Sequence, residues 1–143
     1  MTMSRFMTSI FCDDVRKEEG NKFSYMGVYN GVLFAPAFPL VLPKLCIAMS
    51  VHCRGAGQPP NSLVFSLFRD DEILGELPAD TTQTAKLIRP DVEIGEDQSL
   101  VITAVMQFFP LLINAPCKLK ARATCDGEEL KGGVLSVELF PTQ

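Results

Sequence analysis

Two groups of carboxylates are the side chains best suited to bind a metal ion. They lie on segments that read as turns, and they comprise Asp13, Asp14, Glu18 and Glu19 in the first group and Asp70, Asp71 and Glu72 in the second. Clustered carboxylate oxygens are ligands that Ca²⁺ prefers. The spacing of a calcium-binding loop is absent, however, and Arg16 and Lys17 interrupt the first group. Solvated turns are the simpler interpretation, with Asp14 paired to Arg16 or bonded to backbone amides, and we expect no metal site.

The chain offers little for nucleophilic catalysis. Its single histidine, His52, adjoins Cys53, but neighbouring residues on a strand point to opposite faces, so the two do not form a ready pair. The sequence has neither a Gly-x-Ser-x-Gly motif nor a glycine-rich phosphate loop. A carboxylate pair that hydrolyses glycosides is recognised by geometry alone, which keeps a hydrolase as the least favoured function. We expect no catalytic residue and no cofactor.

The cysteines favour free thiols. There are five, at Cys12, Cys46, Cys53, Cys117 and Cys125, with no Cys-x-x-Cys motif. Cys46 and Cys53 face opposite ways on one predicted strand, and Cys117 and Cys125 share a face but lie roughly 26 Å apart at about 3.3 Å per residue. We therefore expect five buried thiols and a cytoplasmic protein, with a catalytic or metal-bound cysteine as the alternative.

The charge of the chain argues against nucleic acid as a partner. The formal net charge is -4, whereas a phosphate backbone requires a basic surface. One basic stripe, formed by Lys118, Lys120 and Arg122, follows the outer side of a predicted strand. A solvated face is the simpler interpretation of this stripe, and attraction of an anionic ligand is the alternative.

β-Strands must position all of these side chains. In residues 117–125 apolar and polar side chains alternate strictly, a period that no helix can present as one apolar face. Asp126-Gly127 follows, a dipeptide that tolerates the positive φ angles of a tight hairpin, and residues 134–140 alternate again. Further strands are predicted over residues 5–12, 23–29, 32–34, 44–53, 63–69, 72–77 and 100–109, with a short one near residues 92–94.

The strand pattern predicts one antiparallel β-sandwich of about eight or nine strands, with residues 1–143 as a single domain. We expect a charged connection over residues 13–22 and a hairpin turn at Asn30-Gly31. The alternation predicts a shared core that comprises Leu45, Ile47, Met49, Phe65, Leu67, Leu119, Ala121, Val137 and Leu139.

Two connections are unusually apolar. Residues 32–43 and 108–113 carry many large apolar side chains around prolines, and proline is disfavoured inside a sheet. They either cover the open ends of the sandwich or form an exposed patch for a partner or a second copy. The candidate interface residues are Phe108, Phe109, Leu111, Leu112, Ile113, Phe34 and Phe38. Because half of a strand's side chains must point outward, we expect a homo-oligomer.

No segment reads as a signal peptide or a membrane helix. Apolar residues near the N-terminus alternate with polar ones, and Asp13 and Asp14 end the run early. The longest apolar stretch, residues 100–113, contains Thr103, Gln107 and Pro110 and falls short of the roughly 18 residues of a membrane helix. We therefore expect no membrane partner.

Two stretches resemble a known family. The first is Cys-Asp-Asp-Val-Arg at residues 12–16, followed by a Gly-Val-Tyr strand at residues 27–29, and the second surrounds Asp126-Gly127. Together they look like a family of small uncharacterised bacterial and prophage proteins, catalogued as a domain of unknown function. The opening motif is moderately specific and the ending is generic. The resemblance covers most of the chain and implies a fold class and a bacterial or phage origin, but no activity.

These observations favour a non-enzymatic interaction module that self-associates. One alternative is a phage accessory protein that inhibits or sequesters a host component, either a protein or a nucleotide. A minor virion protein is another, and a hydrolase is the least favoured.

Overall fold

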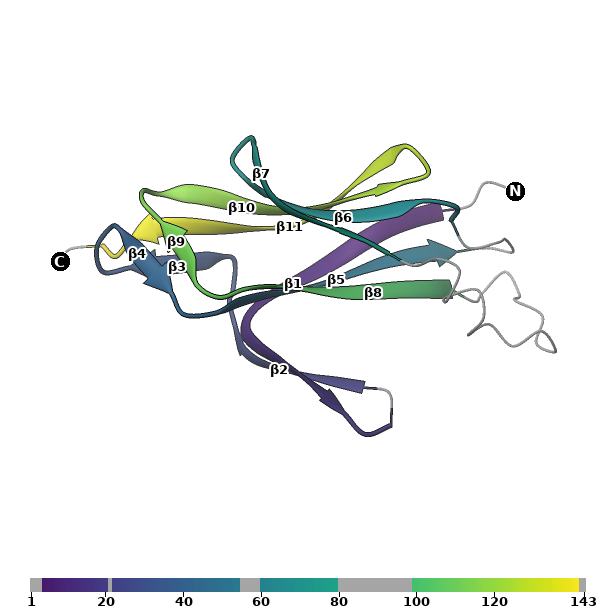
Figure 1. Ribbon diagram of the computed structural model, residues 1–143, viewed down its shortest axis with the longest axis horizontal. Helices are drawn as coiled ribbons and strands as arrows, with labels where there is room; N and C mark the ends of the chain where they lie inside the picture. Colours follow the sequence, from purple (N-terminus) through teal and green to yellow (C-terminus); the bar gives the residue numbers. More distant parts are fainter. Residues whose placement is uncertain (1–3, 21, 55–59, 80–98, 142–143) are drawn as a thin grey trace.

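Two layers of β-strands enclose one apolar core in the computed structural model of the chain (Figure 1). The structure describes residues 4–20, 22–54, 60–79 and 99–141. These residues form eleven strands and no helix, which confirms the predicted all-β sandwich. No helix in this part of the chain is long and apolar enough to cross a membrane. The short strand expected near residues 92–94 lies outside the described residues.

The first sheet has the strand order β2-β1-β5-β8 and is antiparallel throughout. Its strands are β1 (Ser4–Glu18), β2 (Lys22–Val28), β5 (Leu45–Arg54) and β8 (Ser99–Phe108). β1 lies inside the sheet and points Met7 and Phe11 into the core. The next side chains along the strand, Phe6 and Ile10, lie on its other face.

The second sheet has the order β3-β11-β10-β6-β7. Its strands are β3 (Val32–Ala35), β6 (Leu63–Arg69), β7 (Glu72–Pro78), β10 (Cys117–Cys125) and β11 (Glu128–Leu139). The predicted hairpin between β10 and β11 is confirmed, because Asp126 and Gly127 adopt φ angles of 49° and 84°. The prediction of purely antiparallel pairing is wrong for one pair, since β3 runs parallel to β11.

A two-stranded ribbon, formed by β4 (Leu40–Leu42) and β9 (Leu111–Ile113), lies at one end of the sandwich beside β3 (Figure 1). Both strands fall in segments expected to be connections, which is one reason why the structure has more strands than predicted. The two apolar runs, about 70 residues apart in the sequence, thus pair with each other.

The core follows the predicted alternation with one exception. Phe65, Leu67 and Leu119 are fully buried, as are all the other expected core residues except Leu139. Leu139 is 52% exposed, so its assignment to the core is wrong. It is the last residue of β11, beyond the buried Val137. Alternation predicts the side of the sheet but not whether the opposite layer reaches that far.

Residues 13–22 do not form the expected charged connection. β1 continues to Glu18, and β2 begins at Lys22 and pairs antiparallel with it. The second sheet does not cover this part of β1, so the strand needs no apolar face here. Its charged side chains therefore lack the alternation that predicts a strand. The β1–β2 pair therefore extends beyond the sandwich.

Asn30-Gly31 is not a hairpin turn. The flanking strands β2 and β3 belong to different sheets, and the segment carries the chain from one layer to the other. Gly31 does adopt a positive φ of 83°. The Asn-Gly pair therefore predicted a positive φ angle correctly, but it did not predict that the two flanking strands belong to different sheets.

Leu119→Asp should lower the free energy of unfolding by about 4 kcal/mol, because it places an unpaired charge in the core. Leu119 is fully buried, whereas Leu112 is about half exposed. Leu112→Asp is therefore the matched control, with an expected change within about 0.5 kcal/mol of the wild type in the monomeric chain. Urea denaturation measures both. Equal effects would contradict this assignment of the core.

Candidate functional site

The β4–β9 ribbon is apolar on both faces. Leu111 and Ile113 point inward and are buried in the chain's own core, and Leu40 and Leu42 pack partly against it. Between these inward residues, Val41 and Leu112 point outward and lie opposite each other on the two strands. Their side chains are 56% and 49% exposed. The ribbon is thus both a cover for the core and an exposed apolar surface.

The other candidate interface residues divide in the same way. Phe108 and Phe38 are partly buried against the core, whereas Phe109 is 69% exposed just before β9. Phe34 is about half exposed on β3, with its ring edge-to-face against Phe140 at 5.6 Å between centroids. We call the outward Val41, Phe109 and Leu112 the end surface. Leu111 and Ile113, being buried, cannot contribute to it.

A second exposed apolar surface lies on the part of the chain that leaves the sandwich. Beyond Cys12, β1 pairs only with β2, and the two strands form an arm that projects away from the two layers (Figure 1). Nearly every residue of β2 is exposed. The large apolar side chains exposed on it are Phe23, Tyr25, Met26 and Val28.

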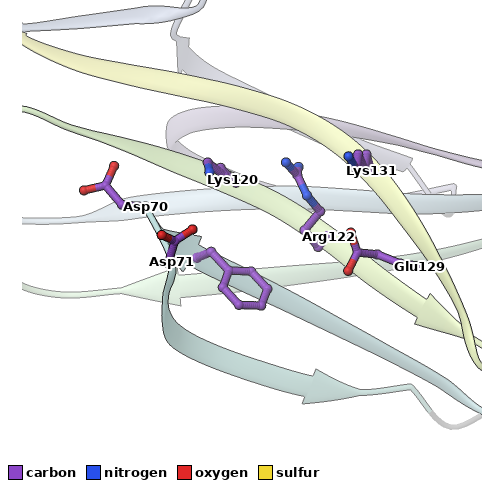
Figure 2. Close-up of a pocket in the computed structure, with 7 residues that line it drawn as sticks. Asp70, Asp71, Lys120, Arg122, Glu129 and Lys131 are labelled. Carbon is purple, nitrogen blue, oxygen red and sulfur yellow. The ribbon is translucent and has the colours of Figure 1, made fainter.

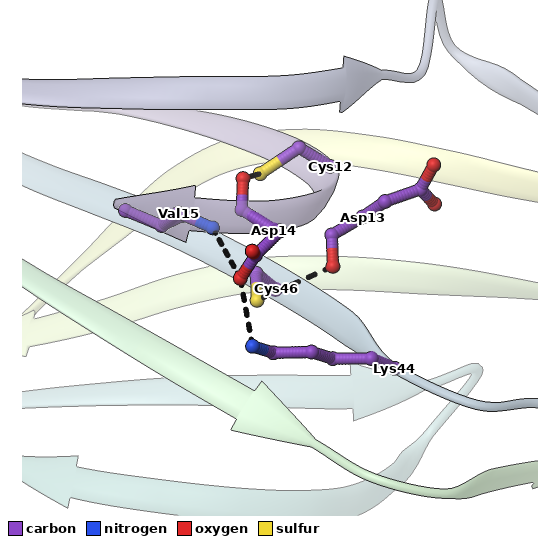
Figure 3. Close-up of polar contacts among 6 residues, drawn as sticks. All are labelled: Cys12, Asp13, Asp14, Val15, Lys44 and Cys46. Carbon is purple, nitrogen blue, oxygen red and sulfur yellow. Dashed lines mark hydrogen bonds and ion pairs between the residues drawn. The ribbon is translucent and has the colours of Figure 1, made fainter.

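The base of the arm is held by polar contacts around Asp14 (Figure 3). The Asp14 carboxylate accepts hydrogen bonds from Lys44 Nζ at 2.7 Å and from the Val15 backbone N–H at 3.0 Å. The Lys44 contact lowers the pKa of Asp14 and raises the pKa of Lys44. Asp14 therefore pairs with Lys44, thirty residues away, and not with Arg16 as its proximity in sequence suggested.

Two thiols bond to the main chain of the same bend. Cys12 Sγ donates to the Asp14 carbonyl oxygen at 3.4 Å, and Cys46 Sγ donates to that of Asp13 at 3.7 Å (Figure 3). Cys12 and Cys46 lie opposite each other on β1 and β5, and both are fully buried. The bend therefore covers this end of the outer face of the first sheet.

Tyr29, which follows β2, connects the second strand of the arm to the bend at Asp13. Its hydroxyl donates to Asp13 Oδ1 at 2.8 Å, and its backbone N–H donates to the Phe11 carbonyl at 2.9 Å. Burial and the Asp13 carboxylate raise the pKa of Tyr29 to about 12, so the phenol remains a donor at neutral pH. Gly27 adopts a φ of 66°, and a Cβ there would overlap the Asp13 side chain. Residues 12–16 and 27–29 thus form the base of the arm.

The predicted basic stripe forms part of a shallow groove of about 230 Å³ on the outer face of the second sheet (Figure 2). Lys120 and Arg122 line it together with Lys131 of β11. Three carboxylates share the groove, from Asp70, Asp71 and Glu129, and Lys118 lies outside it. The stripe is therefore balanced by acidic groups, and the groove does not present a uniformly basic surface for an anion.

The carboxylates and the cysteines are the remaining candidates for metal binding and catalysis. Among the described residues, no group of three or more His, Cys, Asp or Glu side chains is placed to hold a metal ion. All five cysteines are buried, and burial raises the pKa of Cys12 to about 11 and also raises the pKa values of the other four. The thiolate is the nucleophilic form, so we expect these buried thiols to react slowly at neutral pH.

The chain is a β-sandwich that exposes apolar side chains at one end and on the arm. A family model described as "Family of unknown function (DUF6941)" matches residues 7–138. The chain belongs to this family. A search of curated proteins found no match.

The sequence singled out Phe109 and Leu112 of the end surface but no residue of the arm. Residues 23–29 were predicted as a strand, and Phe23 and Tyr25 fall on one of its faces. Nothing in the alternation revealed that this face would remain exposed. The available signal was the run of charged residues from Asp13 to Glu19. Because β2 pairs with this charged part of β1, it has no buried neighbour there.

Thiol counting should return five reactive groups per chain after denaturation without a reductant, and almost none on the same timescale in the native protein. The native thiols are buried, and their raised pKa values keep them protonated. A count of three after denaturation would reveal a disulfide. Rapid reaction of a native thiol would contradict its burial.

Gly27→Ala should destabilise the chain by about 3 kcal/mol, because it combines a strained φ with an overlap with Asp13. Gly20 is the matched control, since it also has a positive φ, of 85°, but has open space around it. Gly20→Ala should lower stability by only about 1 kcal/mol. Thermal denaturation compares the two. Equal losses would show that the contact between Gly27 and Asp13 does not hold the arm.

Proposed function

We propose that this chain is a non-enzymatic binding module that self-associates through exposed apolar surface. The observation that carries the proposal is the β4–β9 ribbon, in which the side chains on both faces are apolar although only one face covers the core. Exposed apolar surface beyond single scattered residues favours a partner. The commonest partner of a soluble chain is another copy related by two-fold symmetry.

Several features support a binding role over an enzymatic one. The thiols are buried and protonated, and the only histidine, His52, stacks on Phe6 with 4.6 Å between ring centroids. The groove lined by Lys120, Arg122 and Lys131 also contains three carboxylates, so its charges are balanced. By contrast, the end surface and the arm both expose large apolar side chains on backbone that is paired in sheets. Such rigid presentation suits recognition.

A bacterial or phage origin and a cytoplasmic location belong to the same proposal. They are supported by the resemblance of the arm motif and by five thiols that suit a reducing compartment. A phage accessory protein or a minor virion protein would use the same surfaces for a different partner. A wild-type chain that remains monomeric would favour such a role.

Leu112→Asp should reduce the mass of the assembly in light scattering without unfolding the chain. Leu112 is exposed, so the charge disturbs only a contact made through the end surface. Ile73→Asp is the control, because Ile73 is similarly exposed but lies on β7 of the second sheet, outside the end surface. Wild type and control should both give at least twice the chain mass of 15.7 kDa at micromolar concentration. An unchanged mass for Leu112→Asp would remove the end surface from the contact.

A further inference from the structure

The outer face of the first sheet carries an uncharged surface made of rows that run across β1, β5 and β8. The middle row consists of Thr8, Ser50 and Thr103, which are register partners on the three strands. Ser50 Oγ and Thr103 Oγ1 lie 2.9 Å apart and share a hydrogen bond. We call this the hydroxyl row. Thr8 and Thr103 are exposed on it.

An apolar row lies on one side of the hydroxyl row. Phe6, His52 and Val101 are register partners, and the rings of Phe6 and His52 stack in parallel. Phe6 and Val101 are 41% and 46% exposed. These side chains stand above the sheet, and they carry no carboxylate or lysine among them.

A second apolar row lies on the other side. It consists of Ile10, Ala48 and Val105, again register partners. Ala48 is small and almost fully buried although it faces outward, because its neighbours are larger. This row is therefore recessed at its centre, whereas the row of Phe6 protrudes.

Among the residues that the structure describes, charges border this face but do not enter it. Beyond Ile10, the chain covers the outer face itself, since Cys12 and Cys46 bond to the main chain of Asp13 and Asp14. Beyond Phe6, the exposed side chain at the next outward position of β5 is Arg54. The corresponding face of the second sheet is different, because Lys120, Arg122 and Lys131 gather there with carboxylates.

We propose that this neutral face binds the same face of a second copy, about a two-fold axis that runs along the hydroxyl row. The inference rests on the self-association proposed above, but it names a surface distinct from the end surface. The hydroxyl row lies between two apolar rows. This axis therefore sets the hydroxyl row against the hydroxyl row of the partner and each apolar row against an apolar row. It also sets the protruding row of Phe6 against the recessed row of Ala48 in the partner.

The charges at the borders match under the same axis. The operation that superposes the hydroxyl rows brings Arg54 of each copy to the partner's covered end, where Asp13 and Asp14 lie. Asp14 is already paired with Lys44, so Asp13 is the carboxylate that meets the partner's Arg54 at each border. A partner with a charged face would instead have to bury an unpaired charge on the neutral rows.

The size of the face calls for a contribution from the arm. Three strands about 4.8 Å apart and the five residues from Phe6 to Ile10 at about 3.3 Å each outline ~240 Å² of flat sheet. A standard interface buries roughly 800 Å² on each partner. The arm leaves β1 at the Cys12 end, which this axis sets against the Phe6 end of the partner, so we expect the exposed Phe23 and Tyr25 to supply the further apolar area.

Cross-linking tests the arrangement directly. A residue on the two-fold axis lies next to its own copy, so Thr103→Cys treated with a short bis-maleimide should give a covalent dimer at twice the mass of one chain. Thr124→Cys is the matched control, because Thr124 is exposed on the outer face of β10. The wild-type thiols are all buried and should give no dimer. Cross-linking of Thr103→Cys no greater than that of Thr124→Cys would overturn the proposal.

The mass of the assembly gives a second test. Thr103→Lys introduces like charges that meet on the axis, so the mass from light scattering should fall at least twofold, whereas Thr124→Lys should retain the wild-type mass. Circular dichroism checks that both variants fold. If Thr103→Lys does not fold, the cross-linking of Thr103→Cys decides whether this interface exists. A folded Thr103→Lys with the wild-type mass would overturn this interface while leaving self-association intact. A wild type with the mass of one chain would overturn both.

Discussion

A β-strand directs alternate side chains to opposite faces, and a two-layer sandwich can bury only one face of each sheet. This constraint governs the whole molecule. It sends Phe65, Leu67 and Leu119 into the core, and it forces the outward positions of the same apolar sequence to remain at the surface. On β10 the outward positions are lysine, arginine and threonine. On β4, β9 and the β1–β5–β8 face they are mostly apolar or hydroxyl-bearing, and there the sandwich has apolar surface that it does not bury itself.

The bend at Asp13 and Asp14 adds the second determinant of the surface. Main-chain bonds from Cys12 and Cys46, the Asp14–Lys44 ion pair and the Tyr29–Asp13 hydrogen bond hold one long strand as it leaves the sheet. Because Lys44 and Asp14 are partly exposed, the ion pair is worth little by itself. Its role is to orient the arm together with the buried thiols. The residues at 12–16 and 27–29 that carry the resemblance thus hold the arm in position.

Alternation predicted the strand positions, the Asp126-Gly127 hairpin and nearly all of the core, because burial on one face leaves a period of two in the sequence. It could not predict β1 beyond Cys12, where neither face is buried and charges occupy the strand. It also misassigned Asn30-Gly31, since a turn signal does not specify the strands it joins. The apolar runs were recognised as interface candidates, but only their pairing shows that Leu111 and Ile113 point inward and Leu112 outward. The neutral face depends on the register of three strands distant in sequence, which no single run reveals.

We infer that further copies of the same chain cover this apolar surface. Sedimentation velocity over a range of concentrations tests it most directly, because it reports the mass of the species in free solution without a label or a substitution. The account predicts a boundary at no less than twice the chain mass of 15.7 kDa, which shifts toward one chain on dilution. A single species of 15.7 kDa at every concentration, including the highest, would contradict it.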